Sequence, residues 1–135
     1  MPDRIRVPGC KVSTMALDIS TLDDRGVLEI RYLPGHVTGA DLDEGRNAVA
    51  AALSESGIRK VFVDASALSQ MPTLIAMLRH NAAIAADSIL RQARFAVVFR
   101  SLGRDERFLE NTGVNRGVNL KCFTSKADAL SWLDE

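Results

Sequence analysis

Polar residues that could support chemistry gather directly behind one apolar run, residues 61–63. Asp64 and Ser66 follow this run, and Ser69 comes three residues later. An unbroken apolar run is typical of a strand that is covered on both faces of a parallel sheet. Ligands of open α/β sheets bind outside the carboxyl ends of such strands. We therefore expect Asp64, Ser66 and Ser69 to lie at the edge of the sheet where a partner or a ligand binds.

The same three residues could also hold a metal, because their spacing is close to a D-x-S-x-S motif. The second serine comes one residue late, however, and a hard cation needs several oxygen ligands placed together. Hydrogen bonds from Asp64 and Ser66 to the neighbouring backbone are the simpler interpretation. We predict neither a metal nor a cofactor.

The two histidines, His36 and His80, offer no recognisable catalytic pair. Neither has a nearby cysteine or a second histidine four residues on, and the chain contains no G-x-S-x-G, G-x-G-x-x-G or P-loop motif. We expect each to be a partly exposed histidine, and we predict no catalytic residue and no enzymatic activity. An enzyme that uses Asp64 with a nearby histidine or arginine is the third alternative.

Thr73 is the sharpest single candidate, because it stands after Pro72 where an apolar helix should begin. A phosphate on Thr73 would lie at a helix N-terminus, where free amides and the helix dipole favour anions. Its charge could repel an acidic partner. The alternative is that Thr73 only caps the helix. Both interpretations remain open.

A second group of candidates should flank the same edge of the sheet. Arg100 and Arg104 follow the next apolar run and could clamp a carboxylate or a phosphate. A solvated helix start with local ion pairs is the alternative. A ligand site here would be a pocket lined by Met71, Ile75 and Phe108, with an arginine at its mouth. Such a pocket would take a small apolar or anionic molecule.

Hydrophobic periodicity predicts five strands and four helices that position these residues. The strands cover residues 15–20, 27–33, 58–64, 93–99 and 120–124. The helices cover residues 38–56, 72–87, 104–111 and 125–133. The order β-β-α-β-α-β-α-β-α predicts an α/β fold with a mostly parallel five-stranded sheet and one antiparallel N-terminal strand.

Length and composition indicate one cytoplasmic domain. We place the domain at residues 14–135, after a flexible N-terminal extension of residues 1–13. Seventeen basic residues balance seventeen acidic ones, which gives no reason to expect a nucleic acid as partner. No apolar run is long enough to insert into a membrane, and the N-terminus has no secretory signal.

The order of elements resembles that of the SpoIIAA-like, or STAS-like, proteins over residues 15–134. The residues that carry the resemblance are Val-Phe-Val-Asp in the third strand and the tail Val-Asn-Leu-Lys-Cys-Phe-Thr-Ser-Lys-Ala-Asp-Ala-Leu-Ser-Trp-Leu. The tail is similar to that of the bacterial branch of these proteins. The resemblance implies a βα superhelix and a non-enzymatic regulatory domain that binds a protein partner or a second copy of itself.

The resemblance also implies a role for Thr73. The family's anti-sigma-factor antagonists carry a phosphorylatable serine or threonine at the start of the helix after the third strand. Thr73 takes that position, and Asp64 takes the position of the acid that ends the strand. The chain departs from the pattern around Thr73, since Pro72 replaces an acid and Leu74 and Ile75 replace a small residue and a glycine. Relatives of the family resemble CRAL-TRIO lipid-binding domains, which implies a small-molecule or lipid-binding module as the alternative function.

Overall fold

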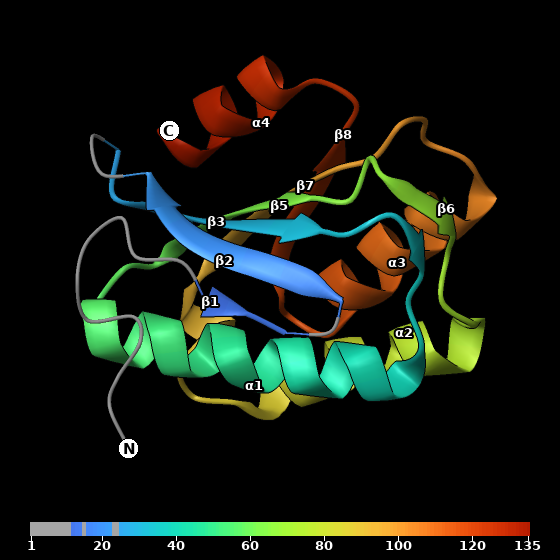
Figure 1. Ribbon diagram of the computed structural model, residues 1–135, viewed down its shortest axis with the longest axis horizontal. Coiled ribbons are helices and arrows are strands. Elements are labelled where there is room, and N and C mark those ends of the chain that lie inside the picture. The colour runs from blue at the N-terminus through green and yellow to red at the C-terminus, as the bar shows by residue number, and fades with distance from the viewer. Residues whose placement is uncertain (1–11, 15, 23–24) are drawn as a thin grey trace.

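A computed structural model describes residues 12–14, 16–22 and 25–135 of the chain. Its main sheet has six strands in the order β1-β2-β3-β5-β7-β8 (Figure 1). They are β1 (Val12–Ser13), β2 (Leu17–Leu22), β3 (Val27–Tyr32), β5 (Lys60–Asp64), β7 (Arg94–Val98) and β8 (Asn119–Phe123). The pairs β1–β2 and β2–β3 are antiparallel, and the pairs from β3 to β8 are parallel. The mostly parallel sheet is confirmed, and each of the five predicted strands has a counterpart. Residue 15 of the first predicted strand lies outside the described residues.

The strand β1 is an addition to the predicted sheet. Val12 and Ser13, which the sequence placed in a flexible extension, pair with Ile19 and Asp18 of β2. Residues 1–11 of the predicted extension lie outside the described residues.

The strand β5 occupies the centre of the sheet, as its apolar run predicted. Val61 lies beside Leu28 of β3 and Phe95 of β7, and these three side chains belong to one buried cluster. Phe62 points to the opposite face, where it is buried with Val27 and other residues. Both faces of β5 are therefore covered. Asp64 is the last residue of the strand and lies at the carboxyl edge of the sheet.

Four helices cover the two faces of the sheet: α1 (Gly39–Ser56), α2 (Leu74–Ala86), α3 (Arg104–Asn115) and α4 (Lys126–Leu133). The first three lie on one face and α4 lies alone on the other (Figure 1). A short 3-10 turn, η1 (Leu90–Gln92), follows α2. The predicted number and order of helices are confirmed.

Helix α1 begins and ends as its sequence predicts. The Thr38 hydroxyl accepts a hydrogen bond from the Asp41 amide at 3.1 Å, and the Asp41 carboxylate accepts one from the Thr38 amide at 3.0 Å. Gly57 ends the helix with a φ of 75°. Gly45 allows close packing, because a Cβ there would lie 2.7 Å from Leu17 Cδ2 in β2.

Helix α2 differs from the prediction at its start. Thr73 is the N-cap residue, so Pro72 precedes the cap and does not lie in the first turn. The buried side chains of α2 are Met77, Asn81 and Ile84.

Helix α3 is longer than predicted, because it passes through Gly113 and ends at Asn115. The predicted helix ended at residue 111, before Gly113, which is buried within α3. A Cβ on Gly113 would lie 2.7 Å from Leu120 Cδ2 and 3.4 Å from Asn81 Oδ1. Close approach to β8 and α2, and not a chain reversal, therefore accounts for this glycine.

A second, two-stranded sheet pairs β4 (Gly35–His36) with β6 (Leu68–Gln70) in parallel. The five predicted strands include neither of these segments. These strands have two and three residues, which is too short for an alternating apolar pattern to show.

Helix α4 is held to its face of the sheet by Arg94 and Trp132. The Arg94 guanidinium stacks 4.1 Å from the centre of the Trp132 ring and donates a 2.7 Å hydrogen bond to the Trp132 carbonyl. Trp132 also contacts the Phe123 ring at a centroid distance of 5.9 Å. The Trp-Leu end of the tail therefore fixes the last helix.

Candidate functional site

Asp64 and Ser66 form a local turn at the carboxyl end of β5. The Asp64 carboxylate accepts hydrogen bonds from the Ser66 amide at 3.0 Å and from the Ser66 hydroxyl at 2.6 Å. Arg100 donates a 3.1 Å hydrogen bond to the Ser66 carbonyl. This geometry matches the simpler interpretation of the Asp-x-Ser spacing, in which the side chains bind the neighbouring backbone.

A polar cleft of ≈ 200 Å³ lies beside this turn and brings several predicted residues together. Its lining includes Ser69, Gln70, Met71, Arg100, Ser101 and Glu106. Arg104 and Ile75 do not line it. Arg104 is an exposed residue at the first position of α3. The Glu106 carboxylate accepts a 2.8 Å hydrogen bond from the Gly103 amide and so caps its own helix.

Thr73 lies exposed at the start of α2, with extended backbone angles. Its hydroxyl accepts a hydrogen bond from the Ala76 amide at 3.1 Å. Thr73 is therefore an N-cap, and its side chain also stands on the surface where a modifying enzyme could reach it. Phosphorylation at Thr73 stays a prediction.

Apolar side chains beside Thr73 face outward. Leu74 is 49% exposed, Ile75 is 61% exposed and Leu78 is 36% exposed. Together with Thr73 they form one surface, the α2 patch, over the first two turns of the helix. Ile75, which was expected to line a pocket, thus lies on the surface beside Thr73.

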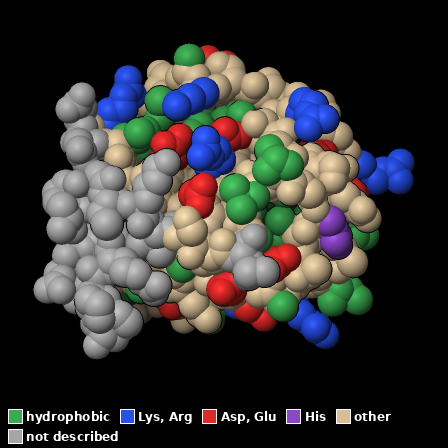
Figure 2. All heavy atoms as spheres, viewed as in Figure 1, with side chains coloured by type: hydrophobic (Ala, Val, Ile, Leu, Met, Phe, Trp, Pro, Cys, Tyr) green, Lys and Arg blue, Asp and Glu red, His purple; other side chains and the backbone are tan. Residues whose placement is uncertain are grey.

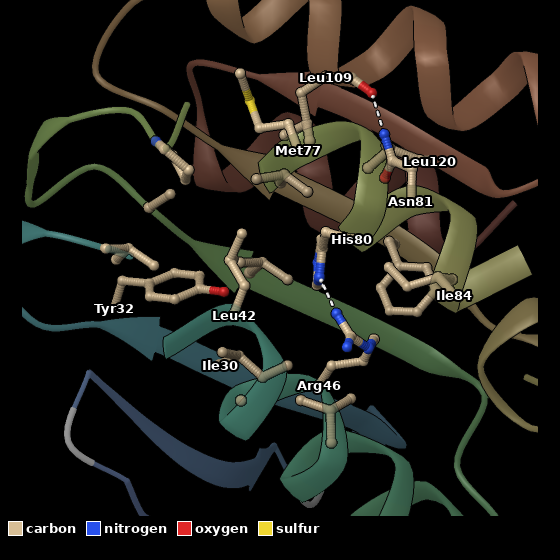
Figure 3. Close-up of a pocket in the computed structure, with 18 of the residues that line it drawn as sticks. Ile30, Tyr32, Leu42, Arg46, Met77, His80, Asn81, Ile84, Leu109 and Leu120 are labelled. Atoms are coloured by element: carbon tan, nitrogen blue, oxygen red, sulfur yellow. Dashed lines mark hydrogen bonds between the residues drawn. The ribbon is translucent and has the colours of Figure 1, made fainter. Parts of the chain in front are cut away.

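An apolar interior cavity of ≈ 100 Å³ lies between the sheet and helices α1, α2 and α3 (Figure 3). Met71 lines it, as expected of a pocket residue, but Ile75 and Phe108 do not. The arginine of the cavity is Arg46 of α1, and not Arg100 or Arg104. The cavity therefore differs from the predicted pocket in its lining, and it lies beneath α2.

Arg46 and His80 join α1 to α2 beside the cavity (Figure 3). Arg46 Nη1 lies 3.0 Å from His80 Nδ1, and Arg46 Nη2 donates a 2.6 Å hydrogen bond to Asp43. Because a guanidinium can only donate, Nδ1 accepts and the imidazole is neutral. Burial, reinforced by the Arg46 charge and opposed by Asp43, lowers the pKa of His80 to about 4.

Tyr32 and Asn81 are the other polar residues of the lining. The Tyr32 hydroxyl points into the cavity (Figure 3), and burial, with the Asp41 charge, raises the pKa of Tyr32 to about 12. Asn81 is only 1% exposed. Its amide nitrogen donates to the Leu109 carbonyl at 3.0 Å and to the Thr112 hydroxyl at 2.8 Å. Asn81 therefore ties α2 to α3.

The inward residues of α2 do follow a signal in the sequence. Met77, His80, Asn81 and Ile84 recur at intervals of three, one and three residues, which is the spacing of one helix face. A more apolar stripe runs through Leu74, Leu78 and Ala82 of the same helix. A helix that is apolar on several sides does not reveal by periodicity which side is buried.

Two further observations limit the chemistry of the described residues. No group of three or more His, Cys, Asp or Glu side chains among them could hold a metal ion. No helix in the described ranges is both long and apolar enough to cross a membrane. On the face in Figure 2, basic and acidic side chains are interspersed, without one large field of a single sign.

The sheet order, with three helices on one face and one on the other, defines a SpoIIAA-like α/β domain. A solved structure of an uncharacterised protein of the DUF3478 family from Shewanella loihica PV-4, described as having a SpoIIAA-like fold, matches the chain with a TM-score of 0.58. The match covers 90% of this chain and 98% of that chain at 21% sequence identity. No protein-family model and no curated protein matches the chain. The SpoIIAA-like fold inferred from the sequence is thus confirmed.

Proposed function

We propose that the chain is a non-enzymatic regulatory domain that binds a protein partner through the α2 patch. The observation that supports this most directly is the exposure of Leu74, Ile75 and Leu78 beside Thr73. Contiguous apolar side chains at a surface mark interaction sites more often than scattered ones do. The SpoIIAA-like fold adds to this, since the resemblance in sequence implies a domain that acts by binding.

The chemistry around the patch favours a partner with apolar and acidic groups. Burying a large aliphatic side chain contributes about 1.5–3 kcal/mol when the whole side chain leaves water. Leu74 and Ile75 are about half exposed, so burying each in an interface would contribute about half of that free energy. Such a contribution suffices for an anchor residue of an interface. Arg79 is exposed and lies four residues after Ile75, so it stands on the same face of the helix. The partner would place a carboxylate against Arg79.

Thr73 would regulate this surface by phosphorylation. A phosphate at the N-cap would gain from the free amides of the first turn and would place negative charge beside Leu74 and Ile75. That charge would repel the acidic partner. Mass analysis of the protein isolated from its source cell tests the modification. An unmodified Thr73 under all growth conditions would discard the switch and leave the docking surface intact.

Capture of partners with matched variants tests the docking surface. Ile75→Asp places a charge in the patch, and Val114→Asp places the same charge on α3, where Val114 is also exposed, at 54%. We expect wild type and Val114→Asp to retain a partner that Ile75→Asp loses. The partner is then purified and its binding is measured directly. Equal capture by all three proteins would contradict the proposal.

From the same resemblance we infer a cytoplasmic, bacterial signalling role similar to that of an anti-sigma-factor antagonist. Self-association through the α2 patch is the other form that this proposal can take. Sedimentation of wild type and Ile75→Asp separates the two forms, because a homodimer held by the patch would dissociate in the variant without any added partner.

A second candidate function is a small-molecule-binding module, and the interior cavity favours it. The volume of the cavity limits which ligands can fit. Pockets for drug-sized ligands measure roughly 300–1,000 Å³, whereas this cavity measures ≈ 100 Å³. A lipid chain would not fit without displacing α2. The ligand of this module would therefore be compact.

A further inference from the structure

The walls of the interior cavity come from both layers of the domain. Leu17, Ile30, Val63 and Val97 belong to the sheet, and Leu42, Val49, Met77 and Leu109 belong to helices α1, α2 and α3. An apolar cavity of about 150 Å³ in another protein stays dry and binds benzene. At ≈ 100 Å³, this cavity is about two-thirds of that size, so a single small ring is the largest guest that comes into question.

The Tyr32 hydroxyl gives this apolar cavity a polar end. It points into the space (Figure 3), and none of the hydrogen bonds between described residues involves it. The Tyr32 side chain is partly exposed, and its hydroxyl has room for a hydrogen-bond partner inside the space. A guest with one polar atom facing Tyr32 would supply such a partner.

The other polar groups of the lining make the site electrically neutral. The positive charge of Arg46 is matched by Asp43, which accepts its hydrogen bond at 2.6 Å. His80 accepts from Arg46 and so carries no charge. Asn81 already donates to Leu109 and Thr112. The described lining residues therefore offer no unpaired positive charge to a bound anion, so its transfer from water into the cavity would be unfavourable.

We propose that the cavity binds a neutral, single-ring molecule with one hydroxyl or carbonyl group, which hydrogen-bonds the Tyr32 hydroxyl. The ring would fill the apolar part between Ile30, Leu42 and Met77. This inference rests on the second candidate function and names its class of ligand. It is independent of the α2 patch, which faces away from the cavity.

Phenol, benzene and benzoate are the probes that test the site, because they share a ring and differ in the polar group. Binding is measured by the rise in melting temperature and by methyl chemical shifts of the cavity residues. We expect phenol to bind saturably and more tightly than benzene, and benzoate to bind at least about tenfold more weakly than phenol. The shifted methyls should be those of Ile30, Leu42 and Val63.

Tyr32→Phe removes the hydroxyl with little change of shape. It should weaken phenol about three- to tenfold and leave benzene unchanged, since a single neutral hydrogen bond is lost. Ala65→Leu, which fills the cavity, should abolish binding of both probes. If Ala65→Leu does not fold, the comparison of Tyr32→Phe with wild type still decides the role of the hydroxyl.

Two results would overturn the inference in different ways. If benzene binds and phenol binds equally well to wild type and Tyr32→Phe, the polar contact is wrong while a ligand-binding module stands. If no probe binds saturably, the ligand site and the second candidate function both fail. Ile75→Asp should bind phenol as wild type does, and this control keeps the outcome separate from that of the docking surface.

Discussion

His80 is partly exposed, as a lone histidine in a helix was expected to be. Its partner could not be expected from the sequence, because the imidazole lies against Arg46 of another helix, beside an apolar cavity, and links α1 to α2. The hydrogen bond needs an unprotonated Nδ1, so the contact depends on pH.

The contribution of His80 to the free energy of unfolding should fall as the pH drops from about 6.5 to about 4. The pKa of His80 is lowered to about 4 in the folded chain, from 6.5. Between these values the unfolded chain binds the proton and the folded chain does not, which favours unfolding. The loss is complete near pH 4, at roughly 3 kcal/mol, and there is none above pH 6.5.

Urea unfolding at several pH values, in wild type and His80→Gln, measures this contribution. Glutamine can still accept a hydrogen bond from Arg46 but does not titrate. The difference in unfolding free energy between the two proteins should change across this pH window. A difference that stays constant from pH 7 to pH 4 would show that the contact with Arg46 does not lower the pKa of His80.

Thr73 combines a structural role with a proposed regulatory one, and stability measurements isolate the first. Thr73→Ala removes the acceptor for the Ala76 amide and should cost about 1 kcal/mol of unfolding free energy. Thr73→Ser and Thr73→Asp keep an acceptor and should cost only a few tenths. Equal stability of all four proteins in urea would exclude the cap. Partner binding by the equally stable Ser and Asp variants then tests the effect of charge without a change in folding.

At the scale of elements, α1 could be predicted almost completely and α2 could not. Thr38, Asp41 and Gly57 fix the ends of α1 through local hydrogen bonds and one left-handed residue, so neighbouring residues alone contain the information. The orientation of α2 depends on tertiary contacts. The buried Asn81 is a polar residue whose partners lie on α3, and no local pattern could reveal that the helix turns this side inward.

Asn81 should be the most sensitive polar position at the contact between α2 and α3. Asn81→Ala removes hydrogen bonds to the Leu109 carbonyl and the Thr112 hydroxyl and leaves a small void, so we expect a loss of about 2–3 kcal/mol. Thr112→Ser keeps the hydroxyl that accepts from Asn81 and donates to the Phe108 carbonyl. It should therefore change stability by less than about 1 kcal/mol. Thermal unfolding of both variants makes the comparison. An Asn81→Ala variant as stable as wild type would contradict the buried link.

For the molecule as a whole, alternation of strands and helices was sufficient to predict the parallel sheet and the fold. The prediction from this alternation succeeds because β5 and β7 are apolar on both faces. Strands of this kind are typical of a sheet that is covered on both sides. The candidate site was predicted less well. Ser69, Met71 and Arg100 do meet at the polar cleft, but the cavity arises where three helices and the sheet leave a gap, and such a gap has no sequence signature.

The two surfaces proposed here belong to opposite sides of one helix. The outward side of α2 carries Leu74, Ile75 and Leu78, and the inward side carries Met77, His80 and Asn81. Variants on one side should therefore leave binding at the other unchanged, unless α2 moves as a unit.

The dissociation constant of a purified partner for Ile75→Asp tests the central claim most directly. Ile75 is the second residue of α2, where an aspartate suits the helix dipole, so the variant should be as stable as wild type. Val114→Asp lies in the last turn of α3, where an acid is less favourable, and is thus the stricter control. We predict that calorimetric titration gives at least about tenfold weaker binding for Ile75→Asp and less than about twofold change for Val114→Asp. Equal dissociation constants for all three proteins would contradict docking through the α2 patch.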